Sequence, residues 1–132
     1  MRALKADNKD NQKTLRSAYW SALFMGAEKL DLTDTELSNI VRLNYKTLNG
    51  WHNNKAHELP FCDLTRSDGI LVKQFIDLYV NLRSMYIDPG SPAKWLKAIN
   101  PSLKNKTPIE FMATEENGIF LVNTYLKSLA SS

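Results

Sequence analysis

The side chains that most often carry catalysis or bind metals are few in this sequence and poorly spaced for either role. His52 and His57 are five residues apart, so they would not lie above one another on a helix as paired metal ligands do. Cys62 is the only cysteine, which excludes an intramolecular disulfide and favours a small structural side chain. Glu115 and Glu116 lie in a polar loop, which is typical of a solvated surface. The sequence therefore predicts no enzyme, no metal site and no cofactor.

A group of polar side chains between residues 44 and 55 is better suited to binding nucleic acid. Lysine can pair with phosphates, while asparagine and tyrosine can hydrogen-bond to phosphates or to base edges. We predict that Tyr45 and Lys46 face base edges and that Asn44 and Lys55 hold phosphates. The complete set of predicted DNA-binding residues is Asn44, Tyr45, Lys46, Asn49 and Lys55.

Two short helices joined by a tight turn would position these side chains. Thr33 and Glu36 have the spacing of a capping box, which satisfies free amides at the start of a helix. Asn44 is a second cap candidate further along the chain. A helix-turn-helix needs a small residue where its helices cross, for which Ser38 is suitable, and apolar residues that lock the pair. The apolar lock consists of Leu37, Val41, Leu43, Leu48 and Trp51.

The second half of the sequence predicts further helices. Apolar residues at helical spacing cover 69–86. The Ser-Pro pair at 91–92 and the Thr-Pro pair at 107–108 each open another helix, because proline is tolerated in the first turn. Helical spacing resumes after Gly118. Since no alternating run of Val, Ile or Thr indicates a strand, we expect an all-α fold. Its predicted C-terminal core is Phe75, Leu78, Leu82, Trp95, Leu96, Ile99, Phe111 and Val122.

The composition favours a folded chain of moderate basicity. Hydrophobic residues make up 43% and charged residues 23%, close to the globular average, so the composition suggests neither disorder nor a membrane protein. The net charge of +3 permits nucleic-acid binding without requiring it. The polar N-terminal sequence lacks the apolar core of a secretory signal, and no run approaches a membrane span. We therefore expect a cytoplasmic protein that does not enter a membrane.

Residues 36–51 resemble the Xre-type helix-turn-helix. That pattern has a Leu-Ala pair, a glycine in the turn, a threonine in the second helix and a late tryptophan. The residues that agree with it are Leu37, Leu43, Thr47 and Trp51. Ser38 replaces the alanine conservatively, whereas Arg42 replaces the turn glycine. A side chain at position 42 is expected to add strain if the turn needs a positive φ.

Residues 92–122 resemble the toxin-binding domain of the Xre/MbcA/ParS antitoxins. The family pattern is a Trp-Leu pair, an Asn-Pro or Pro-Asn turn, a leucine, a Thr-Pro pair and a glycine before a terminal helix. The residues that carry the resemblance are Trp95, Leu96, Asn100, Pro101, Leu103, Thr107, Pro108 and Gly118. Residues 104–106 depart from the pattern, since Lys-Asn-Lys stands where family members often have glycines.

Together the two resemblances imply an antitoxin with a flexible arm (1–12), a helix-turn-helix domain (13–66) and a toxin-binding helical domain (67–132). The C-terminal domain would bind and silence a toxin, commonly a RES-domain or ParT-like protein that attacks NAD or uses it to modify a target. The N-terminal domain would bind operator DNA and repress the shared operon. The resemblance also implies a homodimer, which suits two half-sites on DNA.

Toxin contacts are expected in the loop at 103–106 and on the outward side of the terminal helix. The predicted contact residues are Leu103, Lys104, Lys106, Phe120, Asn123, Tyr125 and Lys127. Two other functions remain open. One is a stand-alone transcriptional regulator without a toxin partner. The other is a purely structural helical interaction module, since two capped helices also form corners in proteins that never meet DNA.

Overall fold

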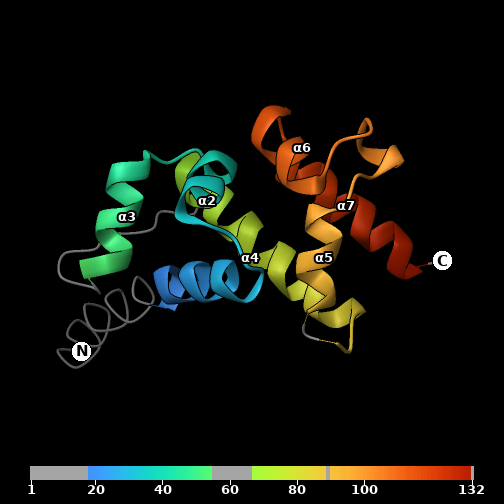
Figure 1. Ribbon diagram of the computed structural model, residues 1–132, viewed down its shortest axis with the longest axis horizontal. Helices are drawn as coiled ribbons and strands as arrows, with labels where there is room; N and C mark the ends of the chain where they lie inside the picture. The colour runs from blue at the N-terminus through green and yellow to red at the C-terminus, as the bar shows by residue number, and fades with distance from the viewer. Residues whose placement is uncertain (1–17, 55–66, 89, 132) are drawn as a thin grey trace, which may run out of the picture.

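The computed structural model describes residues 18–54, 67–88 and 90–131, whose helices lie around one long central helix (Figure 1). A helical segment covers residues 18–29. The elements that follow are α2 (Asp34–Val41), α3 (Tyr45–Asn54), α4 (Ser67–Met85), α5 (Ser91–Lys97), the 3-10 turn η1 (Pro101–Leu103), α6 (Pro108–Thr114) and α7 (Gly118–Ser131). Within these described ranges there is no strand, and Asn100 and Lys106 form an isolated antiparallel bridge. The expected all-α fold is confirmed.

Some predicted features fall outside the described residues. These are the arm at 1–12, Lys55, His57, Cys62 and the side chain of Trp51. In the part of the chain that is described, no helix combines the length and the apolar character needed to cross a membrane.

Local capping explains where several helices begin. Thr33 and Glu36 form the complete capping box at α2, each side chain accepting a hydrogen bond from the other residue's backbone amide. The Asn44 side-chain oxygen accepts from the amides of Lys46 at 2.9 Å and Thr47 at 3.3 Å, at the start of α3. At α6, the Thr107 hydroxyl accepts from the amide of Glu110. The predicted starts of these three helices are confirmed.

The central helix α4 joins the two halves of the fold. It packs along α7 and against α2, and α2 also contacts α6. In Figure 1, α2, α3 and the segment 18–29 lie on one side of α4, with α5, α6 and α7 on the other. The segment 18–29 packs on α4 at Gly26, where a Cβ would be in ordinary contact, 3.4 Å from Tyr79 and 3.5 Å from the Phe75 ring. The buried apolar residues of both halves form one core.

The predicted core needs one correction, at Ile99. This side chain is 70% exposed. The reason is that α5 ends at Lys97 and Ala98 is extended, with φ −97° and ψ 141°. The helical period that would have placed residue 99 beside Trp95 and Leu96 is therefore broken. Leu96 is fully buried, whereas Trp95 is half-buried and its ring stacks on Tyr125.

Candidate functional site

The turn between α2 and α3 is tight and is closed by backbone hydrogen bonds despite its arginine. Arg42 ends α2 in the left-handed region, with φ 61° and ψ 35°, so the positive φ anticipated from the sequence is present. This conformation costs a non-glycine residue about 1–2 kcal/mol. The amides of Arg42 and Leu43 both donate to the Ser38 carbonyl and close the turn. The Arg42 guanidinium reaches across to α6 and donates to the Glu115 carbonyl at 3.0 Å.

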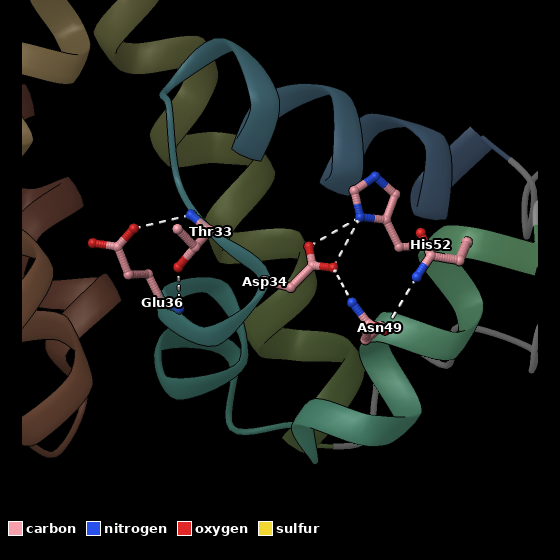
Figure 2. Close-up of polar contacts among 6 residues, drawn as sticks. Thr33, Asp34, Glu36, Asn49 and His52 are labelled. Carbon is pink, nitrogen blue, oxygen red and sulfur yellow. Dashed lines mark hydrogen bonds and ion pairs between the residues drawn. The ribbon is translucent and has the colours of Figure 1, made fainter.

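An acidic side chain of α2 holds the inner face of α3. Figure 2 shows Asp34 accepting a hydrogen bond from the Asn49 amide at 2.8 Å and contacting His52 Nδ1 at 2.9 Å. Since a carboxylate can only accept, Nδ1 of His52 must carry a proton. The His52 ring also stacks on Phe24, with ring centroids 4.6 Å apart and planes at 5°. Asp34 therefore links α2 to α3, and His52 links α3 to the segment 18–29.

The predicted DNA-binding residues of α3 thus differ in their exposure. Asn44, Tyr45 and Lys46 are exposed near its start, and Asn44 also caps the helix. Asn49 is half-buried and its amide is used by Asp34. The role of Asp34 was not predicted, although an acid at the first position of a capped helix is a recognisable signal. Helix α3 itself carries no Asp or Glu.

The loop at 100–107 is closed on itself, which corrects the expectation for Leu103. The amide of Asn100 donates to the Lys106 carbonyl at 3.0 Å, and the amide of Lys106 donates to the Leu103 carbonyl at 3.1 Å. This ring of hydrogen bonds and the 3-10 turn direct Leu103 inward, where it is only 4% exposed. The prediction of an exposed Leu103 was wrong, whereas Lys104 is exposed.

Glu115 forms ion pairs with two lysines of the loop at 100–107. Its carboxylate pairs with Lys104 at 3.0 Å and with Lys106 at 3.4 Å. The hydrogen bond from Lys104 and the positive charges of both lysines lower the pKa of the Glu115 carboxyl below its ordinary value, outweighing the opposing effect of burial. Because the Glu115 carbonyl also accepts from Arg42, one residue connects the loop to the turn between α2 and α3.

The outward side of α7 carries some of the predicted toxin contacts. Phe120 is 55% exposed and Lys127 is also exposed, whereas Tyr125 is half-buried against Trp95. Leu121, which was not predicted, adds a second exposed apolar side chain next to Phe120. The helical spacing from the buried residues Ile119 and Val122 already contains this signal.

Asn123 is the second correction on the predicted toxin surface. It is 7% exposed and faces α4 rather than solvent. Its amide donates to the Gln74 carbonyl at 3.0 Å, and its side-chain oxygen accepts from Asn81 at 3.1 Å. Both polar ends are therefore satisfied inside the protein, as buried polar groups generally are. Asn123 fixes the pairing of α4 and α7.

The two halves meet at a hollow that the sequence did not indicate. A cleft of about 430 Å³ lies between the end of α2, the first turns of α4 and the corner between α6 and α7. Arg42 and Ile70 are among its lining residues. A second polar link joins the halves elsewhere, since Lys97 of α5 pairs with Asp31 at 2.7 Å. The hydrogen bond from Lys97 and its positive charge lower the pKa of the Asp31 carboxyl.

Comparison with known proteins identifies the part of the chain that contains α5, α6 and α7. Residues 82–131 match the family model of the antitoxin Xre/MbcA/ParS C-terminal toxin-binding domain. The matched range begins in the last turn of α4 and ends at the last residue of α7. A search of curated proteins gave no match. Helices α2 and α3 lie before the matched range.

Proposed function

Because residues 82–131 match the antitoxin Xre/MbcA/ParS C-terminal toxin-binding domain, we propose that the chain neutralises a cognate toxin by direct binding. The family match is the observation that carries the proposal. We take the toxin to be a RES- or ParT-like protein that consumes NAD, as the sequence resemblance implies. The antitoxin would act in the cytoplasm as a homodimer and would need no cofactor.

The exposed side of α7 supports the location of the toxin-binding surface. Phe120 and Leu121 present adjacent apolar side chains, and Lys127 lies farther along the same helix. Lys104 is held near the start of α7 by its ion pair with Glu115. Exposed aromatic side chains frequently dominate the binding energy of protein interfaces. We therefore assign toxin contact to Phe120, Leu121, Lys127 and Lys104, with Tyr125 and Lys106 partly accessible beside them.

Replacing Phe120 with Asp should disrupt toxin binding while leaving the fold intact. An aromatic anchor in an interface contributes about 2 kcal/mol or more, so toxin affinity should fall by about 30-fold or more. The measurement is titration calorimetry with the protein encoded beside this chain's gene, combined with growth rescue of cells that express that protein.

Val80→Asp is the matched control, since Val80 is 54% exposed but lies on α4. It should retain full affinity and rescue. If Phe120→Asp binds the toxin as the unmodified chain does, α7 is not the toxin-binding surface. If the unmodified chain binds DNA but not the neighbouring protein, the stand-alone regulator becomes the better description.

We further propose that α3 binds operator DNA and represses the operon. The support is the closed turn at Arg42, the exposure of Tyr45 and Lys46, and the absence of acidic residues from α3. A positively charged helix without carboxylates is compatible with the phosphate backbone.

The double variant Tyr45→Ala, Lys46→Ala should lose operator specificity while keeping its helical content. Removing a good base contact costs about 1–3 kcal/mol, which predicts a loss of affinity of about tenfold or more. Gel-shift titration at several salt concentrations measures both the affinity and the number of phosphate contacts. Equal binding by the double variant would remove these residues from the DNA-binding face.

A further inference from the structure

Gly50 occupies an unfavourable position for a glycine, in the interior of α3. Glycine destabilises a helix interior relative to alanine because it has more backbone freedom to lose. Its φ is not positive, so the backbone conformation does not require glycine. Among the described residues, no atom outside the local helix and chain neighbours lies within 4 Å of the position where a Cβ would stand. The described packing gives no internal reason for the missing side chain.

The neighbours of Gly50 along the helix define an outward strip. Lys46, Gly50 and Asn53 follow one another at intervals of four and three residues, so they share one face of α3. Lys46 and Asn53 are both exposed. The Asn53 amide donates to the Asn49 side-chain oxygen at 3.1 Å, which orients Asn53 on this strip.

The flank of α3 beside this strip is occupied by contacts within the protein. Asp34 engages Asn49 and His52, as Figure 2 shows. This arrangement also turns the Asp34 carboxylate toward the inner side of α3 and sets its negative charge against His52. The outward strip therefore has one cation and no acid of its own helix, which complements a polyanion.

We propose that the strip of Lys46, Gly50 and Asn53 is the part of α3 that enters duplex DNA, and that Gly50 is the point of closest approach. This inference rests on the proposed DNA binding and states which side of α3 faces the DNA. A residue without a Cβ allows a ligand to come close to the helix backbone. Asn53 takes the place on this strip that the sequence had given to Asn49.

The test is Gly50→Ala in the full-length chain. This substitution should raise Tm by about 3 °C, since alanine favours the helix interior. The added methyl group should lower affinity for DNA by about tenfold or more, comparable to losing a base contact. The probe is a fluorescent duplex of about 30 base pairs taken from immediately upstream of the protein's own gene, long enough for two half-sites. An unrelated duplex of equal length measures non-specific binding.

Two further variants distinguish the possible outcomes. Ser84→Ala introduces an alanine at an exposed site of α4 by removing a hydroxyl group, and it should leave DNA affinity unchanged. Lys46→Ala should weaken DNA binding if the proposed function holds. The inference is supported if the wild-type chain binds DNA and both Lys46→Ala and Gly50→Ala lose this binding. If Lys46→Ala loses DNA affinity but Gly50→Ala keeps it, the inference about Gly50 is wrong while the proposed DNA binding stands. If the wild-type chain shows no salt-sensitive DNA binding, both the inference and the proposed DNA binding are wrong.

Discussion

Gly118→Ala is expected to destabilise the C-terminal half more than any other single methyl addition at a described glycine. A Cβ at position 118 would lie 2.7 Å from Met112 Cα and 2.9 Å from the Phe111 carbonyl oxygen. Both are backbone atoms of α6, which cannot move aside as a flexible side chain can. Forcing atoms into a packed core typically costs about 1–3 kcal/mol and occasionally more, and we expect this variant at the upper end. Urea denaturation followed by circular dichroism measures the loss.

Gly26→Ala is the matched control for this prediction. Its added Cβ would meet Tyr79 at 3.4 Å, which is an ordinary contact distance, and the helix would gain from alanine. Its stability should stay within about 1 kcal/mol of the unmodified chain. Equal stability of the two variants would show that α6 and α7 can separate without loss and would contradict the close approach at Gly118. Toxin binding should be weakened only in Gly118→Ala.

Phe75→Ala should produce the second large effect and should destabilise both halves together. Phe75 is fully buried on α4, where the segment 18–29 crosses it. Removing a buried phenylalanine costs about 3–5 kcal/mol, a large part of the stability of a small domain. Because both halves share one core, hydrogen exchange in α2 and in α7 should accelerate in parallel.

The control for Phe75→Ala lies one turn further along the same helix. Val80→Ala removes an exposed side chain and should change the free energy of unfolding by less than about 0.5 kcal/mol. Faster exchange in α2 alone, with α7 unaffected by Phe75→Ala, would show that the halves unfold separately. The assignment of α4 as a shared core element would then be wrong.

Helix boundaries were predictable where their causes are local. Thr33, Asn44 and Thr107 each cap a helix through amides only two or three residues away. Such contacts depend on spacing in the sequence, which can be read directly. The start of α7 at Gly118 was also anticipated, although the close approach to α6 that requires glycine there was not.

Predictions failed where long-range packing decides the direction of a side chain. Leu103 turns inward because the loop closes between Asn100 and Lys106, and a polar loop in the sequence carries no sign of that closure. Asn123 is polar, which suggested exposure, yet its partners Gln74 and Asn81 come from a helix more than forty residues earlier. The sequence therefore predicted which segments form the candidate site, but not which side chains of those segments are exposed.

Arg42 illustrates both what the sequence can predict and what it cannot. The sequence placed a side chain where the resembled turn has glycine, and the structure shows a positive φ at that position. The contact between its guanidinium and Glu115 spans 73 positions and could not be inferred from a local pattern. A substitution that resembled a defect of the turn is thus a connection between the two halves.

The packing of α2 on α6 gives the proposed DNA-binding surface on α3 and the proposed toxin-binding surface on α7 a fixed mutual orientation. When α3 lies in the groove, a toxin bound to α7 would therefore have a fixed orientation relative to the DNA duplex. Moving two half-sites apart by about five base pairs, half a helical turn, would carry one bound chain to the opposite side of the DNA. Operator spacing would then determine whether neighbouring toxins collide or fit beside each other, so that the DNA itself sets how many toxin molecules the repressing complex can hold.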